Sequence, residues 1–174
     1  MTRREAEGFT LVEMLVVIAI LGILMAMMVP AAGLIMKRAK ISNTKSDAGI
    51  VVSTLLKYRS EYNRWPAPYA DSGEGDTDDD WVAMMAPAPG SGSVPANPKR
   101  IVFFEPGSGA VAANGSFADG WGRPFRFQLD LDGDGQMNNP NEEVTGQIRA
   151  RALAWSGGED SDYETWEDNV KSWE

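Results

Sequence analysis

The stretch Gly8-Phe9-Thr10-Leu11-Val12-Glu13, followed by the uncharged run MLVVIAILGILMAMMVPAAGLIM at residues 14–36, decides the fold of this chain. At a rise of about 1.5 Å per residue, a helix over this run reaches roughly 35 Å, enough to cross a hydrocarbon core of about 30 Å. A secretory signal peptide has a shorter apolar core with a small-residue cut site after it, whereas basic residues follow this run. The run therefore predicts a retained membrane helix.

Two residues of this segment carry a specific expectation. Glu13 places a carboxylate near the start of the helix, where an acid costs roughly 2.5–3.5 kcal/mol on insertion scales and therefore needs a partner. Pro30 has no N–H and clashes with the carbonyl four residues earlier, so we expect the helix to kink or loosen near residues 26–30.

Composition and charge exclude several classes of function. The net charge is −9, and the few basic clusters, at residues 3–4 and 37–40, flank the apolar run, where they favour contact with lipid headgroups over nucleic acid. Their positions on both sides leave the membrane orientation open. The chain has no Cys and no His, which excludes disulfides and the Ser-His-Asp, Cys-His and His-zinc types of catalytic site.

The beginning of the chain resembles the signature shared by type IV pilins and the pseudopilins of type II secretion. The match rests on a leader that ends in Gly8, then Phe9-Thr10-Leu11-Val12-Glu13, then an apolar helix that contains Pro30. The resemblance implies that a prepilin peptidase cuts after Gly8 and methylates the new N-terminal Phe9. It also implies that Glu13 pairs with the N-terminal amine of a neighbouring subunit.

The same resemblance implies where the protein lies and what it contacts. The leader is expected in the cytoplasm and the soluble domain in the periplasm, with one span in a bacterial inner membrane. The expected partners are other copies in a filament, other pseudopilins, the prepilin peptidase, the inner-membrane assembly platform and membrane lipid.

After Lys40 the pattern becomes amphipathic and predicts that the helix continues into the soluble domain. Apolar residues recur at steps of three and four and form one stripe: Ile41, Ala48, Val51, Val52, Leu55, Tyr58 and Tyr62. We expect the helix to end at Trp65-Pro66, since the residue before proline is pushed out of the helical region. The stripe requires a cover, which we expect to be a small sheet.

The rest of the chain is predicted to be loops and short strands. Residues 66–99 are rich in Pro, Gly, Ser and Asp and read as a variable loop, with one short helical turn at residues 81–85. Strands are expected at residues 100–105, 125–129 and 147–155. The last two alternate apolar and polar residues, and we expect them to form an antiparallel pair that packs on the helix. The segment from Asp119 to Phe125, DGWGRPF, resembles a turn of the major pseudopilin of type II secretion.

An acidic loop between the last two strands is a first candidate metal site. Asp130, Asp132 and Asp134 alternate before Gly135, as in the calcium loop of an EF-hand, and the carbonyl of Gln136 and the carboxylate of Glu142 are further candidate ligands. The loop differs from an EF-hand at the twelfth position, which is Asn141, and its flanking residues are predicted to form strands instead of helices. A solvated hairpin tip remains the alternative.

The tail is a second candidate. Residues 155–173 resemble the C-terminal loop of major pseudopilins, which binds calcium. The resemblance implies ligands at Gly157 (its carbonyl), Asp160, Asp168 and Asn169; Asn169 stands where the family has an acid, which removes one charge. The alternative is a disordered acidic tail, against which Trp166 and Trp173 argue because such tails lack large aromatics.

The sequence thus predicts an α+β, type IV pilin-like chain with a long N-terminal helix packed on a small antiparallel sheet. Its expected parts are a leader (1–8), a transmembrane helix half (9–36), an amphipathic helix half (37–65), a variable loop (66–99) and a sheet with acidic, calcium-binding loops (100–174). The expected role is a non-enzymatic subunit of a type II secretion pseudopilus. A type IV pilus subunit and a membrane-tethered, calcium-dependent binding module or enzyme are the alternatives.

Overall fold

The computed structural model describes residues 9–107 and 109–174, and the side chains of these residues except 27–32. The predicted cleavage residue Gly8 and the side chain of Pro30, with the kink expected there, lie outside the described residues. The chain divides into two compact units, residues 1–39 and residues 40–174. The long helix α1, Leu11–Tyr62, belongs to both, and each unit is described by itself.

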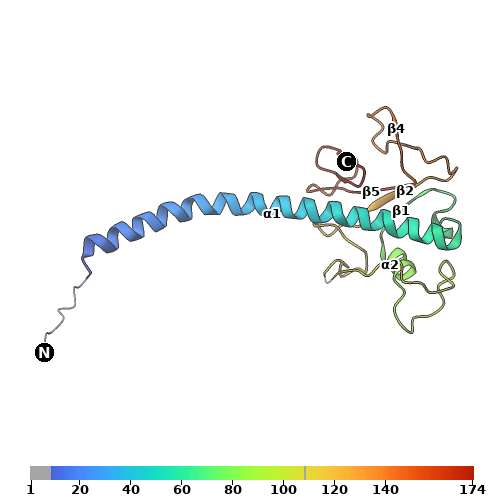
Figure 1. Ribbon diagram of the computed structural model, residues 1–174, viewed down its shortest axis with the longest axis horizontal. Helices are drawn as coiled ribbons and strands as arrows, with labels where there is room; N and C mark the ends of the chain where they lie inside the picture. Colours follow the sequence, from blue (N-terminus) through green and yellow to red (C-terminus); the bar gives the residue numbers. More distant parts are fainter. Residues whose placement is uncertain (1–8, 108) are drawn as a thin grey trace. The chain divides into compact units, whose positions relative to one another are not determined.

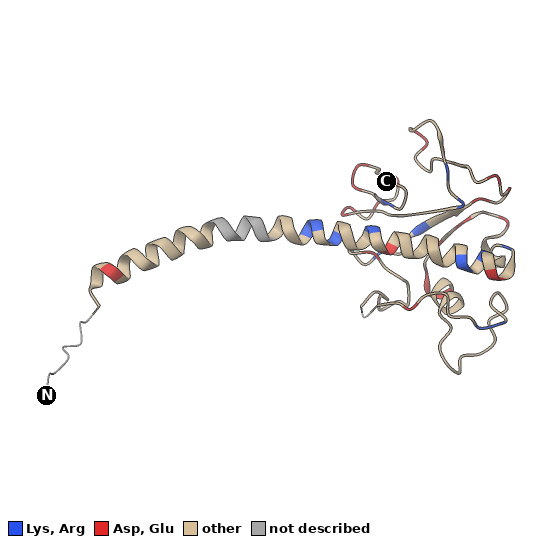
Figure 2. Cartoon of the chain, in the orientation of Figure 1, with Lys and Arg blue, Asp and Glu red and all other residues tan. Residues whose placement is uncertain are grey.

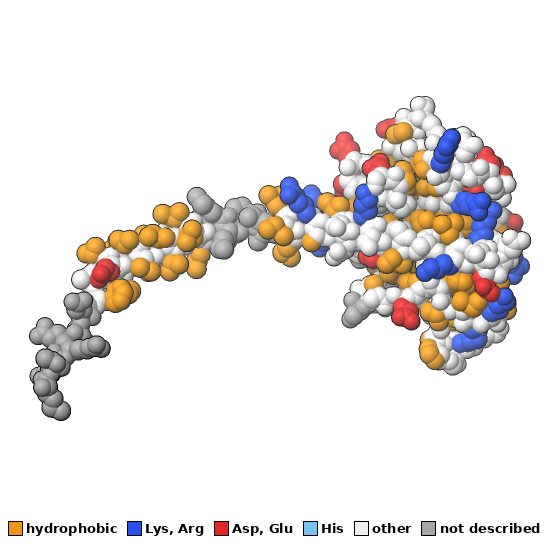
Figure 3. Space-filling model, viewed as in Figure 1, with side chains coloured by type: hydrophobic (Ala, Val, Ile, Leu, Met, Phe, Trp, Pro, Cys, Tyr) orange, Lys and Arg blue, Asp and Glu red, His pale blue; other side chains and the backbone are white. Residues whose placement is uncertain are grey.

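The first unit contains the N-terminal part of α1, whose apolar side chains are exposed. Leu11 is 82% and Ile18 is 65% exposed, and Figure 3 shows hydrophobic side chains along the described part of this helix. Within the part of the chain that the structure describes, no helix is both long enough and apolar enough to cross a membrane. Residues 27–32 lie inside the segment that was expected to do so, and the transmembrane segment stays a prediction.

The second unit is built around the C-terminal part of α1, which lies between the sheet on one side and α2 on the other (Figure 1). The predicted stripe is confirmed at four positions that are fully buried: Ala48, Val51, Leu55 and Tyr58. Thr44 and Thr54 are buried on the same helix, whereas Ile41 is 38% exposed. Helical spacing therefore placed the core contacts correctly from residue 48 onward.

Four short antiparallel strands form the sheet in the order β1-β2-β5-β6, with bounds Glu74–Asp76, Arg126–Leu129, Ala152–Ser156 and Val170–Lys171. The central pair aligns Phe127 with Ala154, and both are fully buried in the core with Leu55 and Tyr58 of α1. A separate two-stranded sheet pairs β3, Met137–Asn138, with β4, Gln147–Ile148. The predicted α+β fold, with a long helix packed on a small antiparallel sheet, is confirmed.

The segment 66–99 is more regular than its composition suggested. It holds a short 3-10 helix, Ala67–Tyr69, the edge strand β1 and the helix α2, Asp79–Met85. Asp78 caps α2, because its carboxylate accepts a hydrogen bond from the N–H of Trp81 at 2.8 Å. Trp81 is fully buried and its ring centroid lies 5.1 Å from that of Phe104, so the apolar patch is part of the core.

Three expected element boundaries were wrong. The long helix ends at Tyr62, before Trp65, because Asn63 adopts φ +52°, a left-handed conformation that ends helices. Residues 100–105 form no strand: Phe103 and Phe104 are buried side chains on an irregular segment whose N–H at Phe103 donates to Met85. The strand expected over 147–155 is split into β4 and β5, which pair with different partners.

Candidate functional site

The first candidate site is the start of α1, where Thr10 and Glu13 form a reciprocal cap. The Thr10 N–H and hydroxyl donate to Glu13 Oε2 at 2.8 and 2.7 Å, and the Glu13 N–H donates to the Thr10 hydroxyl at 3.3 Å. This arrangement is a capping box. The spacing Thr-x-x-Glu indicates such a box, but we did not predict it from the sequence. No bond to Glu13 Oε1 is found among the described residues, so one carboxylate oxygen remains available.

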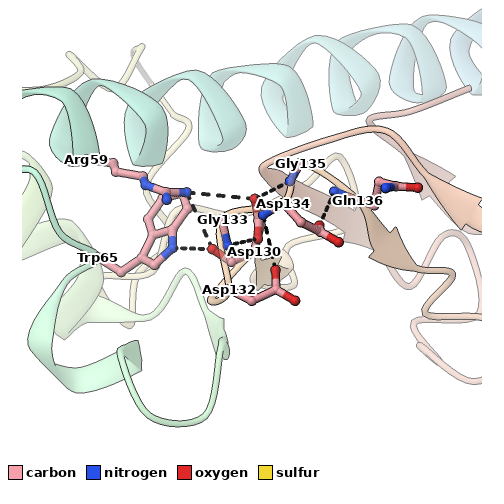
Figure 4. A network of polar contacts seen from close by, with 8 residues as sticks. All are labelled: Arg59, Trp65, Asp130, Asp132, Gly133, Asp134, Gly135 and Gln136. Carbon is pink, nitrogen blue, oxygen red and sulfur yellow. Dashed lines mark hydrogen bonds and ion pairs between the residues drawn. The ribbon is translucent and has the colours of Figure 1, made fainter.

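The second candidate site is the loop after β2, which Asp130 anchors (Figure 4). Its carboxylate accepts hydrogen bonds from the N–H groups of Gly133 at 2.7 Å and Gly135 at 3.0 Å. Its carbonyl accepts from the indole of Trp65 at 2.6 Å, and Arg59 lies 4.0 Å from the carboxylate. The loop is thereby fixed to the C-terminal end of α1.

Burial of Asp130, which is 3% exposed, disfavours its charged form, but these donors outweigh that effect and hold the pKa below its usual value. A carboxyl with a depressed pKa stabilises the fold above its unfolded pKa, and that contribution is lost as the pH falls through the folded value. Asp130 is therefore ionised under neutral conditions and offers a negative charge in a protected position.

Asp130, Asp132 and Asp134 each place an oxygen within 4.8 Å of the other two. Asp132 and Asp134 are exposed, and each accepts a hydrogen bond from an N–H two residues later, at 3.3 and 2.7 Å, so the loop is tightly turned. This donor set fits a hard cation, which prefers carboxylate and carbonyl oxygens and requires six to eight of them. Gln136 adjoins the cluster, whereas Glu142 lines a different cavity.

A second acidic triplet, Asp78, Asp79 and Asp80, also brings its oxygens within 4.8 Å of one another. Asp78 caps α2, and the two other residues lie in the first turn, where negative charge is favoured by the helix dipole. The triplet therefore has a structural explanation as the start of α2.

The C-terminal loop is the third candidate site. Asp160 accepts hydrogen bonds from the Thr165 hydroxyl at 2.5 Å and the Asp162 N–H at 2.8 Å, and these hold its pKa below the usual range. Asp168 Oδ2 accepts from the N–H groups of Glu159 and Asp160 at 2.6 and 3.2 Å. Asp160 and Asp168 line one cavity of about 640 Å³.

The two other predicted ligands of this loop, Asn169 and Gly157, are not among the residues that line that cavity. Asn169 is buried; its amide nitrogen donates to the Tyr163 carbonyl at 3.1 Å, and its Oδ1 has no partner among the described residues. Gly157 packs so closely that a Cβ there would lie 3.0 Å from the backbone of Ser161. The loop is ordered by its own contacts and by Trp166 and Trp173, whose rings lie 5.9 and 6.2 Å from Trp155.

Asp119 has a structural role that was not predicted from the sequence. Its Oδ1 accepts from the N–H groups of Trp121 and Arg123, both at 2.9 Å, and its Oδ2 accepts from the buried Ser156 hydroxyl. Next to it, the Gly120 N–H donates a hydrogen bond to the Thr44 hydroxyl of α1 at 3.0 Å. A Cβ added at Gly120 would also lie 3.0 Å from that hydroxyl, so the close approach favours glycine. The DGWGRPF turn thus ties β5 to the long helix.

Replacing Asp119 by alanine is expected to destabilise the second unit by about 2–4 kcal/mol, because three donors lose their acceptor. Chemical denaturation measures the difference. Asp71→Ala removes an exposed loop carboxylate and is expected to stay within about 0.5 kcal/mol of the parent chain. Equal unfolding midpoints for the two variants would contradict this role of Asp119.

Comparison with known proteins adds the following. Residues 3–29 match the prokaryotic N-terminal methylation motif. The chain is 37% identical over 73 residues to fimbrial protein EcpC of Eikenella corrodens, covering 42% of this chain and 48% of that protein. It is 37% identical over 67 residues to type II secretion system core protein G of Pseudomonas aeruginosa, covering 38% and 47%. The chain thus spans about half the length of these relatives, and no solved structure matches it.

Proposed function

We propose that this chain, which carries a prepilin-type N-terminal methylation motif and is type IV pilin-like, is a structural subunit of a filament assembled from a membrane. The observation that carries the proposal is the N-terminal part of α1, which exposes apolar side chains along its described length (Figure 3). Such a helix requires lipid or neighbouring helices around it. The membrane surrounds this helix with lipid before assembly. A filament whose helices pack in its centre then surrounds it with neighbouring helices.

In this proposal residues 9–36 anchor the subunit in a bacterial inner membrane, with the leader in the cytoplasm and residues 40–174 in the periplasm. Prepilin peptidase removes the leader after Gly8, and the assembly platform moves the subunit into the filament. Figure 2 shows Lys and Arg residues on α1 beyond the described apolar part, a position in which they contact lipid headgroups. The proposed role is mechanical and needs no catalytic residue.

Processing provides the direct test. We expect the chain isolated from its native membrane to begin at Phe9, with a methyl group on the new amine, because the methylation motif includes this residue. Intact-mass and peptide mass spectrometry measure both changes. Gly8→Leu is expected to keep the leader, since a large side chain replaces the small one at the cut, whereas Gly33→Leu, in α1 and away from the cut, is expected to be processed normally. An unprocessed parent chain would refute the proposal.

The proposed filament is a type II secretion pseudopilus, with a type IV pilus as the second candidate. Similarity to core protein G and the DGWGRPF turn support the pseudopilus, and the equally identical fimbrial protein supports the pilus. Deletion of the chain distinguishes the two. Loss of protein export with no change in surface fibres fits the pseudopilus, and the reverse fits the pilus.

We further propose that calcium stabilises the subunit. The loop after β2 offers three carboxylates within 4.8 Å of one another, and these repel each other unless a cation is bound. The C-terminal loop offers Asp160 and Asp168 on one cavity and the unpaired Oδ1 of Asn169 nearby in the same loop. A bound cation closes either loop in a chain that has no disulfide to do so.

A further inference from the structure

A cavity of about 840 Å³ lies on the face of the sheet that points away from α1. Its floor is formed by β1, β2 and β5, where the side chains of Arg126, Gln128 and Trp155 alternate with the core residues Phe127 and Ala154. Its walls are the loop after β3 and the C-terminal loop. The volume falls in the range of pockets that hold ligands, roughly 300–1,000 Å³.

The charged groups of this cavity are mostly acidic. Four carboxylates line it, against the single guanidinium of Arg126: Glu74, Asp76, Glu142 and Glu164. Arg126 lies 3.1 Å from Glu164 and 3.8 Å from Asp76, and its guanidinium sits 4.4 Å above the ring of Tyr163. The cavity therefore already holds one cation between two carboxylates and an aromatic face, an arrangement that favours cations.

A second set of groups in the cavity has no such partner. Glu142 is exposed and makes no ion pair within the described residues. Trp155 and Trp166, whose rings lie 5.9 Å apart, line the same cavity. Glu142 and these rings offer the same chemistry that holds Arg126, a carboxylate with aromatic faces, and Glu142 has no cation of the described residues as a partner.

Two buried polar atoms in the lining are also unpaired. Among the described residues, the indole N–H of Trp155, which is 7% exposed, has no acceptor, and Gln128 Oε1 has no donor. A buried polar group without a partner costs free energy, and a ligand that offers an acceptor and a donor recovers that cost. A peptide backbone offers both, through its C=O and its N–H.

We propose that this cavity binds an extended segment of a partner polypeptide through a Lys or Arg side chain. The cation enters between Glu142 and the rings of Trp155 and Trp166, and the backbone beside it pairs with the indole N–H and with Gln128 Oε1. Both atoms are closed to water, so the side chains that cover them move when the segment enters. The net charge of −9 attracts a basic segment and repels an acidic one.

Titration of the full chain, purified in detergent, with a fluorescein-labelled hexa-arginine peptide tests the proposal by anisotropy. We expect saturable binding that changes the near-UV circular dichroism of tryptophan and is lost in about 1 M salt, where the Debye length is about 3 Å. Glu142→Gln and Trp166→Ala are each expected to weaken binding about fivefold, the equivalent of about 1 kcal/mol.

Each variant has a matched control. Glu143→Gln removes the same charge one residue away, and Trp173→Ala removes a ring that contacts Trp155 from outside the cavity. Both are expected to bind the peptide as the parent chain does. The two Gln variants are expected to keep the parent's thermal midpoint, whereas both Trp→Ala variants lower it, because each removes a ring that packs on Trp155. Absence of saturable binding, equal loss in Glu142→Gln and Glu143→Gln, or equal affinity for a hexaserine peptide or a neutral oligosaccharide would overturn the proposal.

Discussion

Replacing Glu13 by glutamine is expected to abolish filament formation while the chain still inserts into the membrane. In the proposed filament the Glu13 carboxylate pairs with the amine of Phe9 on a neighbouring subunit. Removing one partner of a buried ion pair costs about 3–5 kcal/mol, because the other charge is left uncompensated. That loss recurs at every contact along a filament, so its effect on assembly is large.

The capping box makes this experiment specific. Glutamine retains the ability to accept the Thr10 N–H at the start of α1, so Glu13→Gln removes the charge and keeps the cap. Thr10→Ala does the reverse: it removes the hydroxyl that bonds Glu13, at about 1 kcal/mol, and keeps the charge. Electron microscopy of sheared filaments and membrane fractionation measure the two outcomes.

Filaments are expected for Thr10→Ala and none for Glu13→Gln, with both chains in the membrane fraction. Glu13→Leu is expected to insert at least as well as the parent chain, because the cost of burying an acid is gone. Normal filaments from Glu13→Gln would show that the carboxylate acts only as a helix cap, and the proposed pairing with Phe9 would fall.

Removal of calcium is expected to lower the thermal midpoint of the second unit by about 5–10 °C. A ligand present at 100 times its dissociation constant stabilises by about 2.7 kcal/mol, and each kcal/mol shifts the midpoint by about 2–4 °C in a chain of this size. Melting curves of the full chain with calcium, with magnesium and with a chelator measure the shift.

Single substitutions identify the loop responsible. Asp132→Asn removes one charge from the loop after β2, and Asp160→Asn removes one from the C-terminal loop, where Asp160 lines the cavity with Asp168. Whichever of the two substitutions lies in the loop that binds calcium is expected to abolish most of the calcium-dependent shift of the thermal midpoint. With chelator present, that variant is expected to melt at the same temperature as the parent chain. A parent chain whose midpoint is the same with calcium and with chelator would refute both metal proposals.

Much of the site could be read from the sequence because its signals are local. The alternating aspartates before Gly135 and the stripe on α1 depend on neighbours within a few residues, and backbone geometry fixes their relative positions. Thr-x-x-Glu at the helix start is a local signal of the same kind, but it was overlooked. The predicted pairing of residues 125–129 with 147–155 was confirmed for β2 and β5, since alternation reports which side chains share a face, although β5 covers only the end of the second range.

Other features depended on contacts between distant residues. Asn63 ended the helix earlier than Trp65-Pro66 suggested, and Phe103 and Phe104 entered the core without forming a strand. Residues 66–99 were predicted as a loop with one short helical turn at residues 81–85, and α2 confirms that turn. Its packing, which places Trp81 against Phe104 and Phe117, was not predicted. The energy of these arrangements comes from tertiary packing, which local propensity does not contain.

The sequence by itself determined the processing signal, the amphipathic helix and the acidic loops, because each is a pattern of neighbouring residues with a direct physical meaning. Only the tertiary structure decided that Asp130 is held by Trp65 and Arg59, that Glu142 lies apart from the aspartate cluster, and that four carboxylates from β1 and two loops line one cavity with Arg126. Residues from separate segments meet only when the chain closes on its core, so no local pattern encodes their meeting.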